Sequence, residues 1–122
     1  MGEAMAGIRP SFGPDQVAGF LGAPVKYSDQ NQTSWSEKIV LDWDDYDVQI
    51  DENSPCWKRM HEYHKAAQEF CEGKCLLYNI DMHVNIDGLE ALRGAQNLLF
   101  DLIDKPDAVK KALGQMRAAF VN

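Results

Sequence analysis

The spacing of hydrophobic and polar positions divides the chain near residue 54. Before it, frequent Gly and Pro interrupt every longer pattern, so residues 1–54 are expected to be extended or irregular. One short helix is predicted over "GPDQVAGFLG", with Gly22 as its end. "APVKYSD" predicts a short strand, and partial alternation over residues 35–50 predicts a further strand or extended segment. This half should therefore consist of short elements.

Residues 55–122 have the stronger pattern, which predicts the order helix, strand, helix, helix. The first helix is amphipathic, with Ser54 as its cap and Gly73 at its end. "KCLLYNI" follows as a short apolar run without alternation, typical of a strand buried on both faces of a parallel sheet. A helix over residues 88–103 and another from Pro106 complete an α/β arrangement.

The size and net charge of the chain favour some classes of protein and argue against others. The length of 122 residues suits a single domain over 1–122, and 45% hydrophobic and 25% charged residues are ordinary for a soluble globular protein. The net charge of -7 argues against nucleic-acid partners, because phosphate binding needs clustered Lys and Arg. Without an apolar run of roughly 18 residues or a signal-peptide pattern, we expect a cytoplasmic protein with no membrane partner.

An acidic stretch over residues 42–52 raises the possibility of calcium binding. An EF-hand loop counted from Asp42 would need an oxygen ligand at its fifth position and Gly at its sixth, where this chain has Tyr46 and Asp47. The stretch is therefore interpreted as a solvated acidic loop.

His61, His64, Cys71 and Cys75 have H-x2-H-x6-C-x3-C spacing, which suggests half of a metal site. On a helix, however, His61 falls on the solvent face and Cys71 on the core face, so the two cannot share a tetrahedral ion. We expect no metal site, with zinc on His64 and Cys71 or Cys75 as the alternative. The chain has three cysteines, which are expected to be reduced thiols.

The segment "DMHVN" leaves the carboxyl end of the predicted buried strand, where ligands gather in parallel α/β folds. His83 can donate a proton or bind an anionic group, Asp81 can orient it or accept a proton, and Asn85 can hydrogen-bond a ligand oxygen. The alternative is that these side chains only satisfy backbone groups in a turn. Asp87 and Glu90 match a D-x-x-E capping box for the helix that follows.

Three stretches, "IRPSFGPDQVAGFLGAPVKYSDQNQTSW", "IDENSPCW" and "NIDGLEALRGAQNLLFDLIDKPDAVKKAL", resemble the uroporphyrinogen decarboxylase-like superfamily. That superfamily contains a haem-pathway decarboxylase, which is a carboxy-lyase, and methyltransferases that use corrinoid cofactors. The resemblance implies a (β/α)8 barrel, which usually needs about 250 residues. For this chain it implies a partial TIM-barrel-like slice with few parallel strands and three main helices in its second half.

The resemblance also implies site residues, although neither complete active site of the superfamily is present. The R-Q-A-G-R signature of the decarboxylases is missing, and no His is followed two residues later by Cys, as in the zinc-binding methyltransferases. What can be carried over is a cavity wall, with His83 and Asp81 as catalytic candidates and Asn85, Arg9 and Phe12 as ligand-binding candidates. No cofactor is expected on this chain alone, whereas relatives act on tetrapyrroles or corrinoids, with zinc in the methyltransferase branch.

A barrel slice would leave sheet edges and an apolar face exposed, so the expected partner is a second copy in a homodimer, or a second barrel half. A small-molecule ligand is also expected. The alternative function is a non-catalytic module that binds a small molecule or tetrapyrrole, or that only dimerises.

Overall fold

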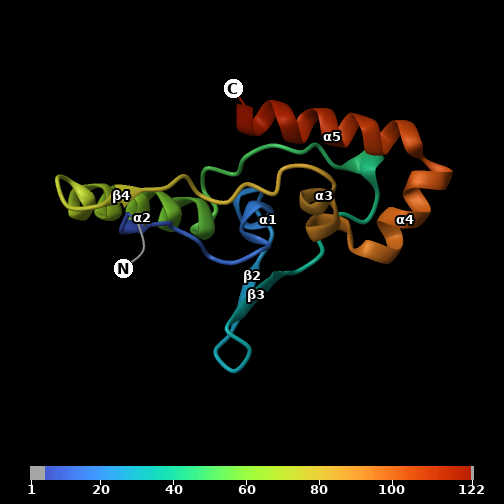
Figure 1. Cartoon of the computed structure of the whole chain (residues 1–122). Coiled ribbons are helices and arrows are strands. Elements are labelled where there is room, and N and C mark those ends of the chain that lie inside the picture. The colour runs from blue at the N-terminus through green and yellow to red at the C-terminus, as the bar shows by residue number, and fades with distance from the viewer. Residues whose placement is uncertain (1–4, 122) are drawn as a thin grey trace.

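The computed structural model of the chain describes residues 5–121 and has a mixed α/β fold (Figure 1). The described residues contain five α-helices, two small sheets and one short 3-10 turn, and they form no closed barrel. The helix α1 lies near the centre, α2 extends to one side, and α3, α4 and α5 lie on the other (Figure 1). In chain order the elements are β1 (Gly7–Ile8), α1 (Gln16–Phe20), β2 (Val25–Ser28), β3 (Thr33–Ser36), η1 (Trp43–Asp45), α2 (Pro55–Cys71), β4 (Leu76–Leu77), α3 (Ile86–Arg93), α4 (Ala95–Asp104) and α5 (Pro106–Val121).

The first sheet consists of β1 and β4, two strands that lie far apart in the sequence. β1 and β4 are parallel, with Gly7 opposite Leu76 and Ile8 opposite Leu77, and the connection between them includes α2. The prediction of a parallel strand after α2 is therefore confirmed. The prediction that both faces of this strand are buried is wrong, because Leu76 is 40% exposed.

The second sheet is the antiparallel hairpin of β2 and β3, in which Val25 lies opposite Ser36. The short helix and the short strand predicted in this half are confirmed as α1 and β2. After β3, residues 37–50 have no strand and form the turn η1, whose residue Trp43 is only 2% exposed. This segment crosses the molecule because its apolar side chains join the core rather than a sheet.

The predicted amphipathic helix is confirmed as α2. The side-chain oxygen of Ser54 accepts hydrogen bonds from the backbone N–H groups of Cys56 and Trp57, as expected of a cap. The chain then turns at Gly73, whose φ of +68° is the left-handed conformation that glycine adopts without strain. Within residues 5–121, neither α2 nor any other helix is long and apolar enough to cross a membrane.

The helix expected over residues 88–103 is two helices, because the chain bends at Gly94, where φ is +88°. The predicted capping box is also wrong. α3 starts at Ile86, and its cap is Asn85, whose Oδ1 accepts a hydrogen bond from the N–H of Asp87 at 3.3 Å. Asp87 therefore lies inside the first turn, and the second half contains four main helices instead of three.

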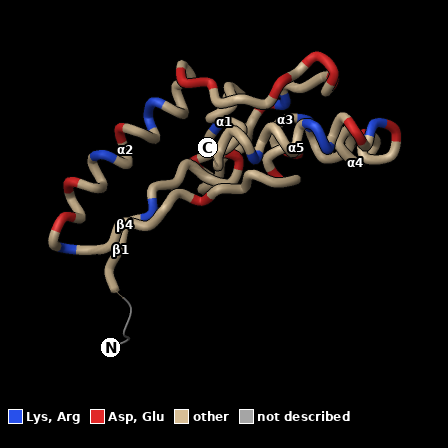
Figure 2. Tube along the Cα trace, turned by 90° about the horizontal axis from the view of Figure 1, so that it is seen from above, with Lys and Arg blue, Asp and Glu red and all other residues tan. Residues whose placement is uncertain are grey.

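One apolar core joins α1 to α3 and α5. The segment of residues 40–48 crosses the same core, and the partly buried Phe120 at the end of α5 packs against it. The buried residues of this core are Val17, Ala18, Leu21, Ala23, Val40, Trp43, Val48, Leu89, Ala91, Leu92, Leu98, Val109, Ala112 and Met116. α2 instead packs against α1 and the short β1–β4 sheet, so these two strands are held at the edge of the molecule. Figure 2 shows this separation from above.

Candidate functional site

The carboxyl ends of β1 and β4 lie side by side because the two strands are parallel. The N–H of Tyr78 donates to the carbonyl of Ile8 at 2.8 Å, which extends the pairing past the last strand residue. Arg9 then lies over the ring of Tyr78, with its Cζ 5.7 Å from the ring centroid, in a cation–π contact. The structure thus brings the segment of Arg9 next to the strand that leads to Asp81.

Gln16 joins the two predicted site segments. Its Oε1 accepts a hydrogen bond from the N–H of Phe12 at 2.8 Å, and its Nε2 donates to the carbonyl of Asp81 at 2.6 Å. Gln16 is 1% exposed, so a buried side chain joins the two segments through partly buried hydrogen bonds. Sequence reasoning missed this residue, although a polar side chain in a short helix whose other positions are all apolar or glycine was the available signal.

Asp81, His83 and Asp87 form a cluster of titratable side chains. The Nε2 of His83 lies 3.3 Å from Asp81 Oδ1, and its Nδ1 lies 3.9 Å from Asp87 Oδ2. The side chains are about half exposed, at 45% for His83 and 55% for Asp81. An imidazole held between two carboxylates can pass a proton to a ligand or accept one, and in its charged form it can pair with an anion.

The backbone at His83 is positioned by α3. A Cβ added at Gly88 would lie 2.7 Å from the carbonyl oxygen of His83, so only glycine permits this close approach. Asn85 also has a structural role, because its Oδ1 caps α3. In residues 5–121, no hydrogen bond joins Asn85 to Asp81 or to His83. Arg9 forms no ion pair with Asp81 in the same residues.

A cavity of about 530 Å³ lies between α2 and the segment of residues 79–82, and Asp81, His83 and Asp87 are not among the residues that line it. Its volume is within the range typical of small-molecule sites. The lining combines apolar side chains with polar groups that include His64 and Lys65. The sequence did not indicate this cavity, because it depends on how residues 79–82 lie across α2. The apolar side chains at the cavity are Trp57, Met60, Ile80 and Met82.

Metal-ligating side chains do not gather in the described part of the chain. Residues 5–121 contain no group of three or more His, Cys, Asp or Glu residues that could hold an ion. In the acidic stretch, Asp42 is paired with Lys105, and Asp47 accepts hydrogen bonds from Lys111 and Gln115. The pKa values of both carboxyls are therefore lowered, mainly by these hydrogen bonds.

Comparison of the chain with models of protein families, with curated proteins and with solved structures finds no match in any of the three.

Proposed function

We propose that the chain is a uroporphyrinogen decarboxylase-like partial barrel that binds a tetrapyrrole or a related small anion at the carboxyl ends of β1 and β4. The parallel pairing of these strands is the observation that carries the proposal, because it sets Arg9 and Phe12 beside the segment of Asp81 and His83. In the proposal, β1 and β4 are neighbouring barrel strands, and α2 lies on the connection between them.

The chemistry of the cavity fits a flat ligand with carboxylates at its edge. Apolar side chains such as Trp57 and Ile80 offer contact for a ring, and Lys65 offers a positive charge for a carboxylate. Arg9 supplies a further positive charge at the carboxyl end of β1, and His83, when protonated, offsets part of the negative charge of Asp81 and Asp87. A tetrapyrrole combines these two requirements.

In this proposal, the chain alone is not a complete enzyme. Asp81 and His83 are half exposed, and water at the site would weaken the electrostatic stabilisation that decarboxylation or methyl transfer needs. A second barrel half or a second copy of the chain would exclude that water. On its own, the module binds a ligand without turning it over.

A titration tests the binding. Uroporphyrin is added to the purified chain while its absorption and fluorescence are recorded, and we expect saturable binding. His83→Ala and Arg9→Ala should each weaken it by about tenfold, the effect of losing roughly 1.4 kcal/mol of interaction. Lys111→Ala is the control, because Lys111 lies on α5 and pairs with Asp47, whereas Arg9 and His83 follow β1 and β4. Equal affinities in all four proteins would refute the proposed site.

A turnover assay with His83→Ala and Asp81→Asn separates binding from catalysis. The wild-type chain is incubated anaerobically with uroporphyrinogen, and the products are separated by chromatography. We expect no decarboxylation. Turnover that disappears in His83→Ala and Asp81→Asn would instead assign these residues to a working active site.

A specific observation favours self-association as the second candidate function. The helix α4 exposes several large apolar side chains that no other described element covers. A soluble chain gains by burying such a surface. The exposed apolar side chains of α4 are Leu99, Phe100, Leu102 and Ile103.

A further inference from the structure

Two cysteines meet where α2 ends and β4 begins. Cys71 is the last residue of α2, and Cys75 directly precedes β4. The turn between them is closed by backbone hydrogen bonds, in which the N–H groups of Lys74 and Cys75 donate to the carbonyl of Cys71 at 2.9 and 3.1 Å. The backbone therefore sets the two side chains on the same side of one tight turn.

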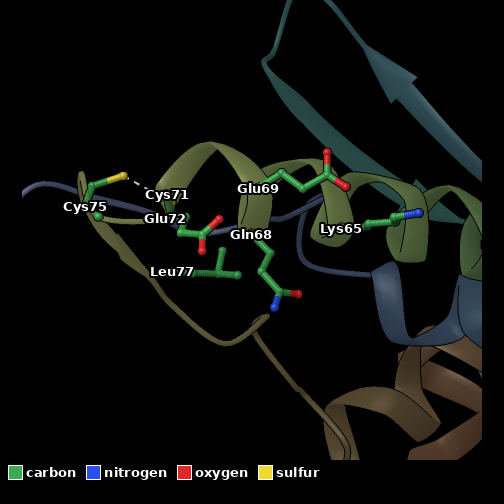
Figure 3. Close-up of a pocket in the computed structure, with 8 residues that line it drawn as sticks. Lys65, Gln68, Glu69, Cys71, Glu72, Cys75 and Leu77 are labelled. Carbon is green, nitrogen blue, oxygen red and sulfur yellow. Dashed lines mark hydrogen bonds between the residues drawn. The ribbon is translucent and has the colours of Figure 1, made fainter.

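The two sulfur atoms are close enough for a small side-chain rotation to join them. Cys75 Sγ lies 3.0 Å from Cys71 Sγ (Figure 3). A disulfide needs about 2.05 Å between its sulfurs, so the two atoms have to approach by roughly 1 Å. Both cysteines are free thiols in this structure.

A cavity gives a small molecule access to this pair. It has a volume of about 610 Å³, and both cysteines line it together with Lys65, Glu69 and Glu72 (Figure 3). Cys75 is only partly buried, whereas Cys71 is 5% exposed. A reagent that enters the cavity therefore meets Cys75 first.

The environments of the thiols give them different roles. The hydrogen bond with Cys75, followed by burial, raises the pKa of the Cys71 thiol. Cys56 is the least reactive toward disulfides, because burial raises the pKa of its thiol to about 11. Cys75 is the thiol placed to attack first, Cys71 the one placed to follow, and Cys56 an internal control.

We propose that Cys71 and Cys75 are a reversible modification site that forms an intramolecular disulfide by exchange with a low-molecular-weight disulfide such as oxidised glutathione. Cys75 Sγ attacks one glutathione sulfur, and the glutathione S–S bond breaks to release one glutathione thiolate. Cys71 Sγ then attacks the Cys75 sulfur of the mixed disulfide, and the second glutathione leaves. The two protein thiols lose two protons and two electrons, and glutathione disulfide is reduced to two thiols.

The bond would tie the end of α2 to the start of β4 covalently. This site is independent of the ligand proposed above, because it requires only the turn, the two thiols and the cavity. Excess reduced glutathione reverses the exchange by the same steps in the opposite order.

Thiol counting tests the proposal. The folded chain is incubated with oxidised glutathione, excess reagent is removed, and the remaining thiols are alkylated and counted by mass spectrometry. We expect the number of alkylated cysteines to fall from three to one, with Cys56 still labelled. The unalkylated oxidised chain should be lighter by about 2 Da, since two hydrogens are lost.

Serine variants define the roles of the two thiols. Cys71→Ser should accumulate one glutathione on Cys75, because the second attack is lost. Cys75→Ser should keep both remaining thiols, and Cys56→Ser should behave like the wild type. Three alkylated cysteines in the wild type, a persistent glutathione adduct, or disulfide-linked dimers would each overturn the proposal. Circular dichroism of each variant checks that it is folded.

Discussion

Asp101 on α4 is a buried carboxylate that binds side chains from two other parts of the chain. Its oxygens accept hydrogen bonds from Arg93 Nε at 2.6 Å and Nη2 at 3.1 Å, which is the two-pronged geometry of a strong Arg–carboxylate pair. The indole N–H of Trp43 donates to the same carboxylate at 2.9 Å. Arg93 also donates to the backbone carbonyls of Val40 and Leu41. The network therefore ties the crossing segment of residues 40–43 to α3 and α4.

Replacing Asp101 should remove the partner of a largely buried charge. We expect Asp101→Asn to lower the free energy of unfolding by about 3 kcal/mol, because Arg93 is then left without a compensating charge. Urea denaturation followed by Trp fluorescence measures the change. Asp104→Asn on the exposed side of α4 is the matched control and should change stability by less than about 0.5 kcal/mol. Equal stability of the two variants would contradict the assigned role.

The stability that the Asp101–Arg93 pair contributes should depend on pH in a defined direction. Hydrogen bonding to Arg93, together with its charge, lowers the pKa of Asp101 below its unfolded value. The resulting stability is present above the unfolded pKa of about 3.9 and is lost as the pH falls through the folded pKa. The difference between the wild type and Asp101→Asn should therefore shrink below about pH 4, as measured by urea denaturation at several pH values.

Among the elements, α1 and α2 touch through a glycine. A Cβ added at Gly19 would lie 2.7 Å from both Cys56 Sγ and Val25 Cγ2, closer than real Cβ contacts allow. Ser54, the cap of α2, also donates its hydroxyl to the carbonyl of Gly19 at 2.5 Å. The absence of a side chain at Gly19 is what allows the start of α2 to pack against α1.

Two glycine substitutions should therefore have opposite effects. Gly19→Ala should lower the free energy of unfolding by about 1–3 kcal/mol through overpacking. Gly114→Ala should raise it by about 0.5–1 kcal/mol, because Gly114 lies within α5 with no atom near its would-be Cβ and alanine favours the helix. Thermal denaturation of both variants compares them directly. A stabilising Gly19→Ala would show that the contact can relax.

Local sequence patterns predicted where the helices begin and end better than they predicted which elements contact each other. The cap at Ser54 and the stop at Gly73 are encoded by neighbouring residues, and both were predicted. The bend at Gly94 was not, because the apolar spacing continues across it and only its positive φ separates α3 from α4. In the candidate site, Asp81 and His83 were proposed from their position after the predicted strand, and the structure adds that their side chains lie 3.3 Å apart. The link through Gln16 joins residues far apart in sequence, which no local pattern encodes.

On the scale of the whole molecule, α4 presents an apolar face to solvent that a partner could bury. Leu99 and Ile103 are one helical turn apart and are 63% and 79% exposed. Two copies of the chain can cover such faces by packing them against each other, which is the commonest arrangement of soluble oligomers. This gives the proposed homodimer a specific interface.

Light scattering coupled to gel filtration tests the homodimer. We expect the wild type to have twice the mass of one chain and the double variant Leu99→Glu, Ile103→Lys to have the mass of one. Val121→Ser is the control, because this exposed apolar residue lies at the end of α5 and outside the proposed interface. A wild-type chain that is monomeric at every concentration would rule out self-association.

The pairing of Gly7 with Leu76 also closes a long loop of the chain. α1, the β2–β3 hairpin and α2 are all synthesised between these partners, so β1 leaves the ribosome long before β4 exists. Closing this long loop has an entropic cost that the short contacts of α3, α4 and α5 do not have. The edge that bears Arg9 and His83 therefore exists only where two segments far apart in the sequence meet.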